Sequence, residues 1–222
     1  MDGTKNLMRI NIILLYLRAI LDSLRIGGYE MYRFFNKLFV LFCVSCIFVV
    51  TSCAPTLVGR VHAMKDAHNR GDVEKELSFF SDDIRCEYGE SFVINGKEEL
   101  RKAVEQNALF RSQMTFTDCK ESGNTVTCKV KEQNDMLKAA GIGPVYYEFS
   151  EQTYEKGLIK GLRARPTQES IRMMSEFRSA FGQWASEKYP QEWAILRAEG
   201  VTKENVNKWL ALVREWRSES ER

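Results

Sequence analysis

The chain has 222 residues, of which 44% are hydrophobic and 28% are charged, a composition that favours folding around a core over disorder. Lysine and arginine number 32 against 30 aspartate and glutamate, so the sequence lacks the basic surplus typical of nucleic-acid-binding proteins. It also lacks paired Cys/His metal spacing, a Gly-rich phosphate loop and a G-x-S-x-G elbow. We therefore predict no nucleic-acid partner, no metal and no cofactor.

An apolar run near the N-terminus is typical of a secretory signal. Residues 38–50 read LFVLFCVSCIFVV, and these 13 residues are too few for a membrane span of about 20. Arg33 and Lys37 precede the run and supply the basic part of a signal peptide. The run ends in Val50-Thr51-Ser52-Cys53, which resembles the lipobox of bacterial lipoproteins.

This resemblance implies that the signal peptide is cut before Cys53 and that Cys53 then carries lipid. The protein would be held by this lipid anchor on the extracytoplasmic side of the cell membrane or the outer membrane. Two alternatives stay open, namely an ordinary signal peptide with an incidental cysteine and an uncleaved anchor.

The first 30 residues do not fit a signal peptide, which should begin close to its apolar run. Met31 is a natural start for a signal peptide over residues 31–52. The codons of Gly27-Gly28 can spell a ribosome-binding sequence just before Met31. We expect residues 1–30 to be an over-extended reading frame, with an amphipathic leader around residues 10–21 as the alternative.

After Cys53 the sequence predicts alternating helices and strands, followed by helices alone. Gly71 ends a first helix, Asp72 caps a second, and Pro166 marks the change to a helical segment. In chain order, the predicted elements are helices 57–70 and 73–80, strand 83–88, helix 97–110, a hairpin over 114–131, helix 134–140, strands 145–155 and 158–165, and three helices within 167–222. The last of these helices is expected to begin at a cap on Thr202.

The hairpin predicts a disulfide. Gly123-Asn124 suits a two-residue turn. The numbers of two residues that face each other across the hairpin then add up to 247, which places Cys119 opposite Cys128. This position is a non-hydrogen-bonded pair, where side chains come closest. An exported chain permits this disulfide, and two reduced cysteines in a core are the alternative.

One feature of the hairpin conflicts with simple alternation. Val130 shares the face of the second cysteine, whereas Phe116 falls on the other face. A bulge near Thr117 or Asp118 would bring the two apolar sets together. Cys86 is left without a partner and is expected to be buried.

Three short motifs resemble the nuclear-transport-factor-2-like superfamily in its SnoaL-like branch. They are Asn69-Arg70-Gly71-Asp72, Phe79-Phe80-Ser81-Asp82-Asp83 and Asn95-Gly96-Lys97-Glu98-Glu99-Leu100-Arg101. The resemblance implies an α+β fold in which a cone-shaped, curved antiparallel sheet packs on N-terminal helices and opens into a pocket at its wide end. Residues 53–166 would form this domain and residues 167–222 a C-terminal helical extension. From the residues themselves, we expect Asp82-Asp83 to form the turn into the first strand.

Ketosteroid isomerases of this superfamily can be tested residue by residue. Their oxyanion-hole tyrosine falls on Met64, their general base on Tyr88, and their second oxyanion acid near Ser150. A thioether cannot donate a hydrogen bond and a neutral phenol is a poor base. We therefore do not expect that chemistry.

Other polar residues are candidates for lining the pocket. Five of them share one predicted strand face, which would bind a polar or aromatic ligand if it looks into the cone and would be ordinary surface if it looks out. Residues 134–141 are the candidate lid, and His62 and His68 are expected to be partly exposed. The candidate pocket residues are Met64, Tyr88, Tyr146, Glu148, Ser150, Gln152, Tyr154 and Leu162.

The helical extension carries the tryptophans, at positions 184, 193, 209 and 216. We expect its apolar faces to cover the outer face of the sheet, with a membrane surface or a partner as the alternatives.

Three functions follow as hypotheses. The first is a membrane-tethered module that binds a small apolar or amphipathic ligand in the cone. The second is a structural or interaction protein of the cell envelope, docking an envelope partner or a second copy through its C-terminal helices. The third is an isomerase, cyclase or hydrolase whose acid–base pair combines Glu87 or Glu148 with Tyr88 or Tyr154.

Overall fold

The computed structural model describes residues 56–90 and 92–222. The predictions for residues 1–30, for the signal peptide 31–52 and for lipidation of Cys53 lie outside these described residues. Among the described residues, none of the helices has the length and apolar character that crossing a membrane requires.

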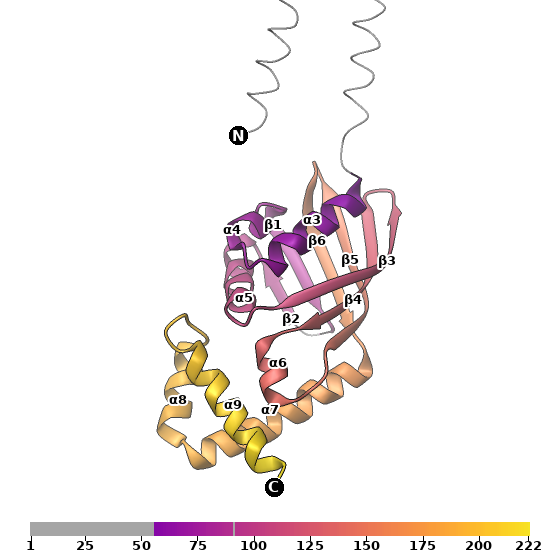
Figure 1. Cartoon of the computed structure of the whole chain (residues 1–222). Helices are drawn as coiled ribbons and strands as arrows, with labels where there is room; N and C mark the ends of the chain where they lie inside the picture. Colours follow the sequence, from indigo (N-terminus) through magenta and orange to yellow (C-terminus); the bar gives the residue numbers. More distant parts are fainter. Residues whose placement is uncertain (1–55, 91) are drawn as a thin grey trace, which may run out of the picture. The chain divides into compact units, whose positions relative to one another are not determined.

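Six strands form one curved sheet in the order β2-β1-β6-β5-β4-β3 (Figure 1). Neighbouring strands are antiparallel except for β1 and β6, which run parallel. The α+β fold class predicted from the sequence is confirmed. The strands are β1 (Phe80–Tyr88), β2 (Phe92–Asn95), β3 (Gln113–Ser122), β4 (Thr125–Gln133), β5 (Val145–Glu155) and β6 (Leu158–Pro166).

The helices fall into two groups (Figure 1). The first group, α3 (Leu57–Asn69), α4 (Val73–Leu77) and α5 (Lys97–Leu109), packs against the sheet around a core that includes Val61, Ile84 and Ile159. The second group lies beyond one end of the sheet. It consists of α6 (Asp135–Ala140), α7 (Gln168–Lys188), α8 (Pro190–Glu199) and α9 (Val206–Ser220).

Local signals set the junction between α3 and α4. Gly71 has φ +66°, a left-handed conformation that ends α3 at low cost only for glycine. The Asp72 side chain then accepts a hydrogen bond from the Lys75 amide and starts α4. The Asn69 amide group bonds both backbone groups of Met114, at 2.9 and 2.7 Å, which ties the end of α3 to the edge strand β3.

The hairpin of β3 and β4 contains the disulfide between Cys119 and Cys128, whose Cα atoms lie 4.1 Å apart. Pairing shifts by one residue between Thr117 and Lys120, and Asp118 takes φ +53° at this point. The shift is the bulge expected from the sequence. It sets Phe116 opposite Val130 on the buried face. Cys86 is buried and free.

Three boundaries differ from the sequence-based expectation. Strand β1 begins at Phe80, so Asp82 and Asp83 are exposed strand residues and not the turn before the strand. Strand β2, which pairs with β1, was missed because it has only four residues. Helix α9 begins at Val206, since Thr202 and Asn205 bond each other's backbone amides in a turn before it.

The C-terminal helices do not cover the outer face of the sheet, and the expectation that they would was wrong. They form a second core with α6 and the end of α5, which we call the second core (Figure 1). Its buried residues are Phe110, Ala139, Ala140, Phe177, Phe181, Ala185, Leu196, Val206, Leu210, Leu212 and Val213. The four tryptophans are half-buried against this core, so intramolecular packing accounts for the aromatic content of the extension.

Candidate functional site

A buried histidine–carboxylate pair links the first two helices. His68 on α3 is 3% exposed and Glu76 on α4 is 5% exposed. The Nδ1 atom of His68 lies 3.0 and 3.2 Å from the two carboxylate oxygens of Glu76. A carboxylate only accepts hydrogen bonds, so Nδ1 carries the proton and donates. The sequence-based expectation that His68 would be partly exposed was therefore wrong.

The other ring nitrogen of His68, Nε2, is buried and has no hydrogen-bond partner among the described residues. In the neutral ring, Nε2 then carries a lone pair that can accept a proton or a hydrogen bond. A buried polar atom without a partner carries a free-energy cost of about 1–3 kcal/mol. A ligand group or an ordered water that donates to Nε2 would remove that cost.

A second carboxylate lies on the inner face of the sheet. Glu132 on β4 accepts hydrogen bonds from the Ser112 hydroxyl at 2.9 Å and from the Tyr147 hydroxyl at 3.0 Å. Tyr88 on β1 packs against the core that the sheet shares with α3, and the charges of Glu132 and Glu76 help to raise the pKa of its phenol. We call His68, Glu76, Tyr88, Glu132 and Tyr147 the interior polar cluster.

The phenols of this cluster are held neutral. Burial, with smaller contributions from Cys86, Glu132 and Glu76, raises the pKa of Tyr88. Burial and the neighbouring Glu132 raise the pKa of Tyr147 in the same way. Both tyrosines therefore act near neutral pH as hydrogen-bond donors and not as bases.

These pKa shifts predict cooperative unfolding at alkaline pH. Burial also raises the pKa of Cys86 to about 12 and that of Tyr154 to about 12. A group whose pKa is raised by folding stabilises the folded state below its ordinary pKa and loses that contribution as the pH rises towards the folded value. For each such group, the free energy of unfolding should fall by about 1.4 kcal/mol per pH unit above pH 9–10.

The measurement is tyrosinate absorbance and far-ultraviolet circular dichroism across pH 8–13. The part of the absorbance change from buried tyrosines should coincide with the loss of circular dichroism. The chain unfolded in guanidinium serves as the control, because its tyrosines should titrate without any such step. Complete tyrosine titration in a chain that keeps its secondary structure would contradict the conclusion that folding raises the pKa of these tyrosines.

The five predicted pocket residues on β5 divide between the two faces of that strand. Ser150, Gln152 and Tyr154 are buried, and the Tyr154 hydroxyl donates to Gln152 at 2.9 Å. Tyr146 and Glu148 are exposed, although simple alternation would place them with the other three. Pairing shifts on both sides of β5, between positions 147 and 150, explain the difference, because an extra residue reverses the facing of the chain.

Two further predicted pocket residues, Met64 and Leu162, are 2% and 8% exposed and belong to the core between the sheet and helices α3, α4 and α5. Ser150, Gln152 and Tyr154 are buried as well, so five of the eight candidates lie in the protein interior. Of the eight candidates, Tyr88 is the one that lies in the interior polar cluster.

The acid–base pairs expected from the sequence do not converge. Glu87 accepts a hydrogen bond from Arg85 on the outer side of β1, and Glu148 is exposed. Sequence reasoning missed Glu76 and Glu132. Glu132 could have been found, since it lies two residues after Val130 on β4 and therefore shares its face of the strand. The approach of Glu76 to His68, in contrast, depends on the turn between two helices.

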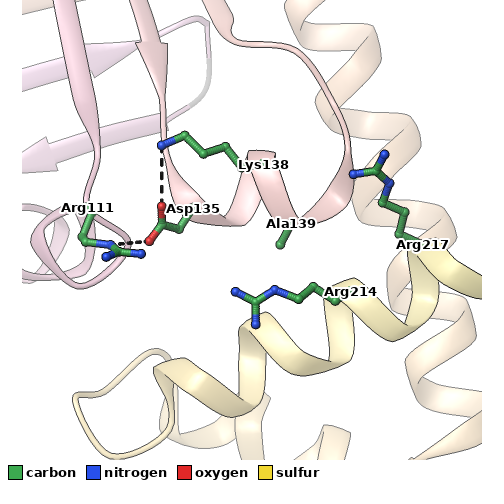
Figure 2. A pocket seen from close by; sticks show the side chains of 6 residues that line it. All are labelled: Arg111, Asp135, Lys138, Ala139, Arg214 and Arg217. Atoms are coloured by element: carbon green, nitrogen blue, oxygen red, sulfur yellow. Dashed lines mark hydrogen bonds and ion pairs between the residues drawn. The ribbon is translucent and has the colours of Figure 1, made fainter.

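A separate pocket of about 410 Å³ lies between α6 and α9 (Figure 2). Its lining consists of Arg111, Asp135, Lys138, Ala139, Arg214 and Arg217, and we call it the basic pocket. The expected lid, residues 134–141, contains α6, which packs on the second core. Within residues 56–90 and 92–222, no group of three or more His, Cys, Asp or Glu side chains could hold a metal ion.

No family model matches the sequence, and no curated protein matches it. Among solved structures, the chain is similar to a nuclear-transport-factor-2-like protein of unknown function from Cytophaga hutchinsonii, with 13% identity, a TM-score of 0.45 and coverage of 54% of this chain and 96% of that one.

The chain is also similar to SalBIII, an epoxide hydrolase/cyclase-like enzyme of pyran ring formation in salinomycin, with 16% identity, a TM-score of 0.45 and coverage of 50% and 89%. A computationally designed 17-OHP binder is similar at 20% identity, with a TM-score of 0.45 and coverage of 53% and 94%. The fold class itself rests on the strand order and helix placement of this chain.

Proposed function

We propose that the protein is a lipid-anchored extracytoplasmic module that binds a small amphipathic molecule beside the interior polar cluster. The observation that carries this proposal is the Nε2 atom of His68, which is buried without a hydrogen-bond partner among the described residues. A hydroxyl or amide of the ligand would donate to Nε2. Apolar side chains of the core to which α3 and β1 contribute, such as Met64, Ala67 and Ile84, would contact the rest of the molecule.

The donors and acceptors of the cluster restrict the ligand. Glu132 already accepts from Ser112 and Tyr147, while Tyr88 offers a phenol held neutral by its raised pKa. A ligand that carries one donor and one acceptor on an apolar frame would match Nε2 and the Tyr88 hydroxyl together. The lipobox-like Val50-Thr51-Ser52-Cys53 supports the membrane anchor.

Native mass spectrometry of the full chain, purified from the membranes of an exporting bacterium, tests the binding. We expect a mass adduct that survives native ionisation and is lost on denaturation. The matched control is the double variant His68→Leu, Glu76→Leu, which replaces the polar pair with apolar side chains and should therefore show no adduct. An adduct-free wild type, or an adduct retained by the control, would contradict the proposed site.

The denatured spectrum tests the anchor independently. A chain that begins at Cys53 and carries added acyl mass would support it, and Cys53→Ser should remain unlipidated. A wild-type mass that matches the unmodified chain would contradict the anchor and leave the binding result unaffected.

A proton-transfer enzyme is the second candidate function. The hydrogen bond from Nδ1 to Glu76 orients the imidazole and leaves Nε2 free, which is the arrangement a general base requires. If the recovered ligand exchanges carbon-bound hydrogen for deuterium only with wild type and not with His68→Gln, the site is catalytic. Exchange that is equal in both would leave binding as the function.

A further inference from the structure

The basic pocket is separate from the interior polar cluster, and its charge is unbalanced. Four cationic side chains and one carboxylate line it, which leaves a net charge of three positive. They come from three parts of the chain, with Arg111 following α5, Asp135 and Lys138 on α6, and Arg214 and Arg217 on α9.

The existing ion pairs leave part of this charge free. Asp135 lies 2.5 Å from the Arg111 Nε atom and 3.7 Å from the Lys138 Nζ atom. Arg217 pairs with Glu221, one helical turn further along α9, at 2.7 Å. Arg214 makes no ion pair with any described residue, and Figure 2 shows its guanidinium pointing into the gap between α9 and α6.

The pocket is also held in shape by its surroundings. Helices α6 and α9 pack against each other through the second core. Gly141 ends α6 with φ +71°, and a Cβ atom there would lie 2.4 Å from the Arg217 guanidinium carbon. Glycine therefore leaves room for the Arg217 guanidinium beside the end of α6.

We propose that the basic pocket binds a phosphate group carried by an organic molecule. Guanidinium groups match phosphate oxygens through paired hydrogen bonds, and a phosphate would offset the free charge of Arg214. The volume of about 410 Å³ exceeds that of a phosphate ion and suits a small phosphorylated molecule or a phospholipid headgroup. Asp135 orients Arg111 and Lys138 without neutralising the pocket.

The test uses the full chain in a non-ionic detergent and three probes: inorganic phosphate, pyrophosphate and short-chain phosphatidylglycerol below its micellar concentration. Binding is measured by isothermal titration calorimetry at constant ionic strength. Arg214→Gln is the test variant. Lys208→Gln is the matched control, because it removes one positive charge from an exposed position on the same helix outside the pocket.

We expect wild type and Lys208→Gln to bind at least one probe alike, and Arg214→Gln to bind it about tenfold or more weakly. Tighter binding of pyrophosphate would assign the site to soluble phosphate esters, and tighter binding of phosphatidylglycerol to a lipid headgroup. The proposal is overturned if wild type binds none of the three probes, or if Arg214→Gln binds them as tightly as Lys208→Gln does.

Discussion

Replacement of Phe181 with alanine should destabilise the protein by about 3–5 kcal/mol, the usual cost of removing a large aromatic side chain from a core. Phe181 is 4% exposed in the second core. Its ring lies 5.5 Å from that of Trp193, 5.7 Å from Phe177 and about 6.1 Å from both Trp184 and Trp216. Loss of the ring would leave four aromatic neighbours around a cavity, and a cavity among large rigid rings collapses poorly.

Urea denaturation followed by tryptophan fluorescence measures this cost directly, because all four tryptophans pack on the second core. Near-ultraviolet circular dichroism should weaken in the folded variant for the same reason. Ile171→Ala on the same helix is the control, since Ile171 is 43% exposed and its truncation should change stability by no more than about 0.5 kcal/mol. Equal effects of the two substitutions would contradict the assignment of Phe181 to a packed core.

The parts of the fold that depend on neighbouring residues could be predicted from the sequence. Gly71 and Asp72 act within one turn of their own positions, so their roles in ending α3 and starting α4 could be identified in advance. The pairing of β3 with β4 follows from the turn at Gly123, and the apolar alternation of both strands required the bulge found at Asp118.

The parts that depend on tertiary packing could not be predicted. The extra residue in β5 near Glu148 has no glycine or proline to indicate it, and it moves Tyr146 and Glu148 to the exposed face. The apolar stripe of α7 predicted burial but not the surface that buries it, because a helix face fits a sheet or other helices equally well. His68 required knowledge of where α4 turns back to bring Glu76 beside it.

Removal of one member of the His68–Glu76 pair should be costly, whereas removal of both should not. Glu76→Leu leaves the Nδ1 hydrogen of a 3%-exposed histidine without its acceptor, and we expect a loss of about 3 kcal/mol in the free energy of unfolding. In the double variant His68→Leu, Glu76→Leu, two apolar side chains replace the pair, so stability should return to within about 1 kcal/mol of wild type.

Chemical denaturation of the wild type, the two single variants and the double variant measures the coupling between the two residues. The comparison also separates structure from function. A pair kept for stability would make the double variant the least stable of the four, which would contradict our expectation. A double variant that folds like wild type but no longer retains the co-purified ligand would mean that the buried pair serves binding, since apolar side chains can replace its contribution to the fold.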